Sequence, residues 1–212
     1  MNLSRRQALA FLVACLFLAL TFCRALTLER GAGGATGGCF LLLAALSLFL
    51  LRREGVEPDA LTGMLPLIAL TLLLRVLLLE HVTLDYENFL HKWTEHFRRF
   101  GGFAALKDPV GNYNVPYLYI LAFLSYLPFP DLYGIKLFSI LFDILLAWGG
   151  LRLAGLLTSE KSAPLVAFSA LLLLPTVVLN GSAWGQCDSI WTAFCVHALV
   201  CGLENRRIVF SR

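Results

Sequence analysis

Two aspartates lie at boundaries between apolar runs and polar residues, and a carboxylate at such a position can have either of two roles. Asp85 stands near the start of "LDYENFLHKW", and Asp188 lies within "NGSAWGQCDSIW", residues 180 to 191. A carboxylate at such a boundary can cap the first amides of a helix. It can also take a proton from a hydroxyl nucleophile. A single aspartate would favour the cap, whereas two acids framed by aromatic, amide and basic residues favour the second role.

Basic residues follow the first aspartate within the same polar segment. They are His91, Lys92, Arg98, Arg99 and Lys107. Fixed cations in a partly dry site stabilise the negative charge that develops on a leaving phosphate. Any one of these side chains is more typical of a contact with lipid headgroups, but together they predict a cradle for an anionic, lipid-linked substrate.

The composition assigns the chain to the membrane proteins. Apolar residues make up 58% of the sequence and charged residues 15%, and the mean hydropathy is +0.76. Such values lie far outside the range of soluble domains and indicate an all-α, polytopic transmembrane protein. A net charge of +3 does not imply a nucleic-acid partner. The six cysteines show neither a disulfide framework nor a metal-binding spacing.

Apolar runs of sufficient length predict about six membrane spans. A helix needs about 20 mostly apolar residues to cross a bilayer core about 30 Å thick. Five runs meet this length, and a shorter sixth run follows the flexible segment "GAGGATGG". The five runs are residues 8 to 28, 61 to 80, 132 to 155, 163 to 180 and 188 to 204, and the shorter run is 36 to 51.

The charge pattern orients these spans. Residues 116 to 129 are apolar but short and bracketed by prolines. If this segment stays on the outer side as an interfacial or re-entrant helix, most basic residues of the short loops and termini face the cytoplasm, as the positive-inside rule requires. These residues are Arg5, Arg6, Arg52, Arg53, Arg152, Lys161, Arg206 and Arg207. Both termini are then cytoplasmic, and the loops 81 to 131 and 180 to 188 lie outside.

The long outer loop opens with an amphipathic pattern. Its large apolar side chains recur at helical spacing and leave the charged residues largely on the other faces. They are Tyr86, Phe89, Leu90, Trp93, Phe97 and Phe100. This pattern predicts a helix that lies in the membrane interface.

Charged residues also fall inside the predicted spans. Asp143 lies near the middle of its span, and Lys136 lies two turns earlier on nearly the same face, about 10 Å away along the axis. Intramembrane charges suggest a functional role, although an interhelical hydrogen bond is the favoured interpretation for Asp143. Arg75 lies about one turn from the outer end of its span, where it can snorkel or reach a lipid phosphate. His197 is predicted to make a polar packing contact.

Several segments resemble bacterial members of the GT-C superfamily of integral-membrane glycosyltransferases, distant relatives of the protein O-mannosyltransferases and the dolichol-linked sugar transferases. The resemblance is carried by "LDYENFLHKW", "GGFAALKD", "NYNVPYLYIL", "IKLFSILFD" and "LPTVVLNGSAWGQCDSIW", and it covers roughly residues 61 to 207. In that superfamily an essential acid lies near the start of a large outer loop, which corresponds to Asp85. A second acid at the outer end of a later span corresponds to Asp188.

The resemblance implies a function and a substrate. Family members transfer a sugar, here a mannose-like hexose, from a polyprenyl phosphate to an acceptor hydroxyl on the outer face of a membrane, here a bacterial plasma membrane. Asp85 is then the general base, and the five basic residues contact the donor phosphate. Side chains that stack on or hydrogen-bond the sugar are Tyr113, Asn114, Tyr117, Trp184 and Gln186. A divalent cation, Mg²⁺ or Mn²⁺, and no cofactor at all are equally compatible with the family.

The same resemblance divides the chain. Residues 1 to 55 hold two additional spans whose role the sequence leaves open, and residues 56 to 212 correspond to the N-terminal part of a GT-C core. Family members have more spans, so the chain is expected to end before the family pattern is complete. Two other classes stay open: a transporter or lipid flippase that uses Arg75, Lys136 and Asp143, and a non-catalytic envelope subunit. The sequence determines neither the sugar, the acceptor nor the oligomeric state.

Overall fold

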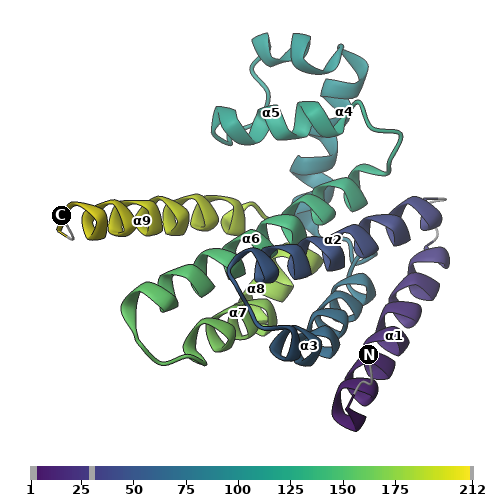
Figure 1. The fold of residues 1–212 in the computed structure, drawn as a ribbon. Helices are drawn as coiled ribbons and strands as arrows, with labels where there is room; N and C mark the ends of the chain where they lie inside the picture. The colour runs from purple at the N-terminus through teal and green to yellow at the C-terminus, as the bar shows by residue number, and fades with distance from the viewer. Residues whose placement is uncertain (1–3, 29–31, 211–212) are drawn as a thin grey trace.

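Helices make up every regular element in the part of the chain that the structure describes (Figure 1). The structure, a computed structural model, describes residues 4 to 28 and 32 to 210, with the side chains of 206 to 210 left out. Four helices are long and apolar enough to cross a membrane: α1 (Arg5–Leu26), α2 (Gly33–Arg53), α3 (Pro58–Leu77) and α6 (Asp131–Leu157). The prediction of an all-α chain with membrane-spanning helices is confirmed at this level.

A fifth candidate span is broken. Helix α7 (Ala163–Leu173) continues into α8 (Pro175–Val178) and the π-helix η3 (Leu179–Trp184), and the two parts are bent by 47°. The break falls at Pro175, which has no amide hydrogen to donate to the preceding turn. The two parts together cover the predicted span 163 to 180.

The predicted sixth span is not established. It corresponds to helix α9 (Asp188–Phe210), which is long enough to cross but is not among the described helices apolar enough to qualify. Asp188, His197 and Glu204 lie along it and lower its hydropathy. The structure therefore supports four or five spans, and the count of six stays a prediction.

The glycine-rich segment before the second span is helical, which corrects the expectation of a flexible connection. Helix α2 begins at Gly33 and includes most of this segment. The glycines allow α1 and α2 to approach closely: a Cβ on Gly37 would lie 2.6 Å from the ring of Phe22, and a Cβ on Gly33 would lie 2.7 Å from the carbonyl oxygen of Ala25. Here glycine serves helix packing rather than flexibility.

Side-chain contacts give the direction of each helix. Gln7 near the start of α1 donates to Asp59 near the start of α3, and Arg24 near the end of α1 pairs with Glu80 just beyond α3, so these two helices are parallel. Helix α6 runs the opposite way, because its Lys136 contacts the end of α3.

Helix α9 runs alongside α6 in the same direction. Ser189 contacts Asp143, and Glu204 contacts Arg152 further along both helices. As a result, residues 78 to 130 and the loop 180 to 188 lie toward one end of the bundle, and the loop 158 to 162 lies at the other. Which end faces the outside stays a prediction from the basic residues.

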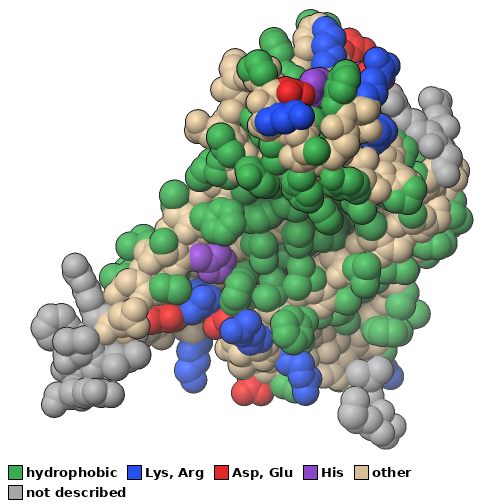
Figure 2. Space-filling view, turned by 90° about the horizontal axis from the view of Figure 1, so that it is seen from above, with side chains coloured by type: hydrophobic (Ala, Val, Ile, Leu, Met, Phe, Trp, Pro, Cys, Tyr) green, Lys and Arg blue, Asp and Glu red, His purple; other side chains and the backbone are tan. Residues whose placement is uncertain are grey.

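Residues 84 to 130 form a small helical subdomain at one end of the bundle (Figure 1). Its elements are the π-helix η1 (Tyr86–Leu90), α4 (His91–Arg99), the 3-10 helix η2 (Gly102–Lys107) and α5 (Val115–Leu124). Helix α5 has 10 residues and is about 15 Å long, too short to cross a bilayer core. In Figure 2, charged side chains gather at two opposite ends of the molecule with a broad hydrophobic band between them, as a membrane protein requires.

Candidate active site

The carboxylate of Asp85 is held by a side chain that is 101 residues away in the sequence. Gln186 donates from Nε2 to Asp85 Oδ2 over 2.5 Å, and its Oε1 accepts a hydrogen bond of 2.9 Å from the hydroxyl of Tyr113. Asp85 makes no side-chain capping bond at the start of η1; instead, Thr83 Oγ1 accepts from the amide of Tyr86. The capping role considered for Asp85 is therefore not observed, and its carboxylate belongs to a polar chain of three residues.

Aromatic rings form one wall of this site. The ring of Tyr113 meets Trp93 edge-on at a centroid distance of 5.3 Å and lies 5.2 Å from Tyr117. Gly111 lets the loop pass against Trp93, since a Cβ there would lie 2.6 Å from the indole. Aromatic faces beside amide and carboxylate groups are suited to a ligand with both apolar C–H faces and hydroxyl groups, such as a sugar.

Burial and nearby charge keep Tyr113 protonated. Burial raises the pKa of Tyr113 to about 12, with further contributions from Cys187, Asp85 and Asp188. The phenol therefore stays a hydrogen-bond donor to Gln186 even at pH values above 10, where an ordinary tyrosine loses its proton. Gln186, which bonds Asp85, stands two residues before Asp188, so the two aspartates lie in the same region of the molecule.

Asp188 begins α9 and ties the ends of the polar loop together. Its Oδ2 accepts a hydrogen bond of 2.6 Å from Asn180 Nδ2. Between them lies Cys187, a buried thiol whose pKa is raised by burial and by the charges of Asp188 and Asp85. The loop thus gathers an acid, two amides and a thiol beside the start of the long loop.

Two of the five basic residues predicted to contact the donor phosphate are paired with acids in the described part of the chain. Arg99 pairs with Glu95 one turn earlier on α4, at 2.5 Å, and His91 Nδ1 lies 2.5 Å from Asp131 Oδ2 at the start of α6. The other three cations are exposed on the subdomain, and none makes an ion pair within the described part of the chain; they are Lys92, Arg98 and Lys107. Arg99 and His91 are therefore already paired with Glu95 and Asp131, and neither pair was predicted from the sequence.

Two of the predicted sugar-binding residues are exposed and are not members of the polar chain. Asn114 is exposed at the start of α5 and makes no side-chain capping bond, and Trp184 is also exposed. Tyr113 and Gln186 belong to the chain itself, and Tyr117 is buried against Tyr113. Of the five predicted residues, two belong to the polar chain, one packs against it and two are exposed.

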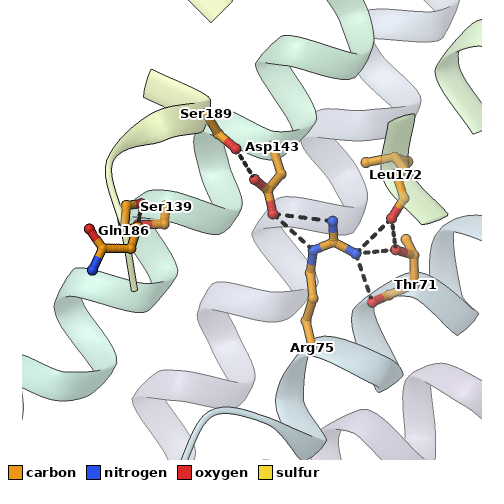
Figure 3. A network of polar contacts seen from close by, with 7 residues as sticks. All are labelled: Thr71, Arg75, Ser139, Asp143, Leu172, Gln186 and Ser189. Carbon is orange, nitrogen blue, oxygen red and sulfur yellow. Dashed lines mark hydrogen bonds and ion pairs between the residues drawn. The ribbon is translucent and has the colours of Figure 1, made fainter. Parts of the chain in front are cut away.

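A buried ion pair lies deeper in the bundle (Figure 3). The Nε and Nη2 atoms of Arg75 donate to Asp143 Oδ2 over 3.3 and 3.2 Å, and both side chains are fully buried. Asp143 therefore makes the interhelical contact favoured by the sequence. Arg75 neither snorkels nor reaches a lipid phosphate, because its charge is paired inside the bundle.

The break in the fifth span supplies another partner for Arg75. Leu172 lies in the last turn of α7, before Pro175, and its carbonyl oxygen accepts from Arg75 Nη1 over 3.0 Å and from Thr71 Oγ1 over 2.9 Å. The kink frees this carbonyl from the regular helix pattern. The roles of Thr71 and Ser189 in this network were missed, because hydroxyl groups in apolar helices commonly bond to their own preceding turn.

The remaining intramembrane polar residues make structural contacts. Lys136 Nζ donates to the carbonyl oxygens of Leu78, Leu79 and His81 at the end of α3, over 3.1, 3.0 and 2.6 Å. A cation is favourable at this end of a helix. His197 lies 2.9 Å from the carbonyl oxygen of Leu145, the packing contact that the sequence predicted.

Comparison with protein-family models, curated proteins and solved structures found no match to this chain. Among the residues that the structure describes, no group of three or more His, Cys, Asp or Glu side chains is arranged to hold a metal ion. Any functional assignment therefore depends on the geometry of Asp85 and its neighbours.

Proposed function

We propose that the chain is a membrane glycosyltransferase that moves a sugar from a polyprenyl-phosphate donor to an acceptor hydroxyl, with Asp85 as the general base. The observation that supports this most strongly is the bond from Gln186 to Asp85, because it orients a half-buried carboxylate beside an aromatic wall. General bases work when a second group fixes their orientation toward the proton that they abstract.

The reaction that we propose is a single displacement with inversion. The acceptor hydroxyl attacks the anomeric carbon while Asp85 takes its proton, and the bond between that carbon and the phosphate oxygen breaks. The electron pair of this bond leaves with the polyprenyl phosphate. Tyr113 and Trp93 would contact the sugar, and Asp188 would accept hydrogen bonds from its hydroxyl groups.

The phosphate requires cations that are not already neutralised. Lys92, Arg98 and Lys107 on the subdomain are exposed and unpaired within the described residues, so we assign the donor phosphate to them. These side chains are long and flexible enough to move toward a bound lipid at the membrane interface. The proposed donor therefore approaches the exposed side chains of α4 and η2.

The direct test measures sugar transfer by the purified full chain in lipid nanodiscs, with a radiolabelled polyprenyl-phosphate hexose and a panel of acceptors that carry hydroxyl groups. Replacing Asp85 with Asn should reduce the rate at least about 100-fold, the usual contribution of a general base. Asp108→Asn is the matched control, since Asp108 is an acid of the same subdomain that bonds His96. Equal rates for D85N and D108N would contradict the proposal.

A transporter is the second candidate, because a buried pair such as Arg75 and Asp143 is typical of transport pathways. Transport predicts a different pattern: D143N should abolish substrate movement across vesicles, and D85N should have little effect. A non-catalytic envelope subunit should tolerate both changes. Measuring transfer and flux with the same variants separates the three functions.

A further inference from the structure

Both ends of the polar loop 180 to 188 contact the same carboxylate, that of Asp143. Before the loop turns, Gly181 in η3 lies directly against Asp143: a Cβ on this glycine would be 2.8 Å from Oδ2 and 3.2 Å from Oδ1. After the loop, Ser189 in α9 donates from Oγ to Asp143 Oδ1 over 2.5 Å (Figure 3). One side chain of α6 therefore meets the chain where it leaves the fifth span and where it enters α9.

Asp143 is itself immobilised by Arg75. The guanidinium bonds Asp143 Oδ2 through two nitrogens and reaches Leu172 in the last turn of α7 through a third. Neither charge can leave its partner without standing alone in a buried position, which is strongly unfavourable. The pair thus joins α3, α6 and the broken span into one rigid support beneath the loop.

The middle of the loop is fixed from the same helix. Ser139, one turn before Asp143 on α6, donates to the backbone carbonyl oxygen of Gln186 over 2.9 Å. The backbone N–H of Gln186 donates to the backbone carbonyl oxygen of Asn180 over 3.1 Å. Gly185 turns the chain here with φ of +71° and packs against α6. The backbone of Gln186 is therefore held on two sides, and its side chain extends from there to Asp85.

We propose that Asp143, held by Arg75, is a positioning residue that fixes the loop 180 to 188 so that Gln186 presents its amide to Asp85. The ion pair is then part of the machinery of the site, not a transport pathway and not only a helix staple. The link to sugar transfer rests on the proposed function, whereas the link to loop position does not.

Two variants loosen the support without leaving a buried charge unpaired. Ser189→Ala removes the bond at one end of the loop, and Gly181→Ala inserts a methyl group against the carboxylate at the other end. Thr192→Ala is the matched control for the first, since within the described residues the hydroxyl of Thr192 bonds the carbonyl of its own preceding turn and nothing else. Gly63→Ala is the control for the second, because a Cβ at Gly63 would meet nothing within 4 Å.

Cys187 reports on the loop directly. Its side chain is buried between Gln186 and Asp188, so its alkylation by N-ethylmaleimide requires the loop to open. In the full chain in nanodiscs, with the modified peptide quantified by mass spectrometry, both test variants should alkylate Cys187 at least about 10-fold faster, as expected for a local opening. Both controls should stay within about twofold of the unmodified chain. Unchanged alkylation in S189A and G181A would overturn the positioning role.

Kinetics separate positioning from general stability. In the transfer assay, S189A and G181A should lower kcat about 10-fold or more and change KM much less, because the base is misaligned while the phosphate contacts assigned to the subdomain remain. A loss confined to the amount of folded protein would contradict positioning. Faster alkylation of Cys187 together with no transfer by the unmodified chain would keep the positioning role and overturn the proposed function.

Discussion

The pair of Arg75 and Asp143 allows a quantitative test of the bundle. At a separation of 3.2 Å, two unit charges attract by about 5 kcal/mol at an effective dielectric constant of about 20. That attraction is offset by the cost of removing both charges from water, so the cost of breaking the pair is mainly the cost of the partner left behind. We therefore expect the two single substitutions to be strongly destabilising and the double substitution to be mild.

The two single variants should differ in magnitude. Asp143→Leu leaves a guanidinium that cannot lose its proton, and this should cost about 5 kcal/mol of unfolding free energy, the upper end for a broken buried pair. Arg75→Met leaves a carboxylate that a proton can neutralise, and this should cost about 3 kcal/mol. The double variant should lose only about 2 kcal/mol, because Ser189 and the carbonyl of Leu172 each lose a hydrogen bond. The coupling energy is then about 6 kcal/mol.

The assay is reversible unfolding by sodium dodecyl sulfate in mixed micelles, followed by far-UV circular dichroism. The pair of Arg152 and Glu204 is a matched control, since its atoms lie closer, at 2.7 Å, but its side chains are 19% and 40% exposed. Its coupling energy should stay below about 1 kcal/mol. A coupling below about 1 kcal/mol for the buried pair as well, or a double variant less stable than both single variants, would refute the reasoning.

Three further predictions concern the subdomain and the loop. The raised pKa of Tyr113 means that the folded chain keeps this proton between pH 10 and about 12 while the unfolded chain loses it, so stability should fall as pH rises through that window. Burial also raises the pKa of Tyr117, so the unfolding midpoints of Tyr113→Phe should show a weaker dependence on pH in this window than those of the unmodified chain. Because the pKa of Cys187 is raised, the midpoint of its alkylation rate against pH should lie above the ordinary thiol value of 9.0. Alkylation for a fixed time at a series of pH values, followed by quenching, measures this midpoint. Gly111→Ala should lower the free energy of unfolding by about 2 to 4 kcal/mol, because the residue has a positive φ and the added methyl group would clash with Trp93. Gly55→Ala is the control, since this residue has a positive φ but no clash, and it should lose about 1 kcal/mol. Equal losses in thermal unfolding would contradict the close approach of Gly111 to Trp93.

The sequence by itself determined the class of the protein and the position of most helices. A membrane span is a local property, since about 20 apolar residues suffice to satisfy both the backbone and the lipid. Length alone left residues 116 to 129 ambiguous, and the charge pattern predicted that they do not cross. The structure gives α5 only 10 residues there. The sequence also drew attention to Asp85 and Gln186, because polar side chains are conspicuous beside apolar runs, and the resemblance to the GT-C superfamily implied Tyr113.

Only the tertiary structure decided which polar groups meet. Asp85 and Gln186 are 101 residues apart, and Arg75 and Asp143 are 68 residues apart, so no local pattern relates the members of either pair. The basic residues follow the same rule: they cluster in the sequence, but only the fold shows which of them are paired with acids, as Arg99 is with Glu95. Hydropathy ranks residues by their cost in lipid, whereas pairing depends on helix rotation and depth, which are set by packing across the whole bundle.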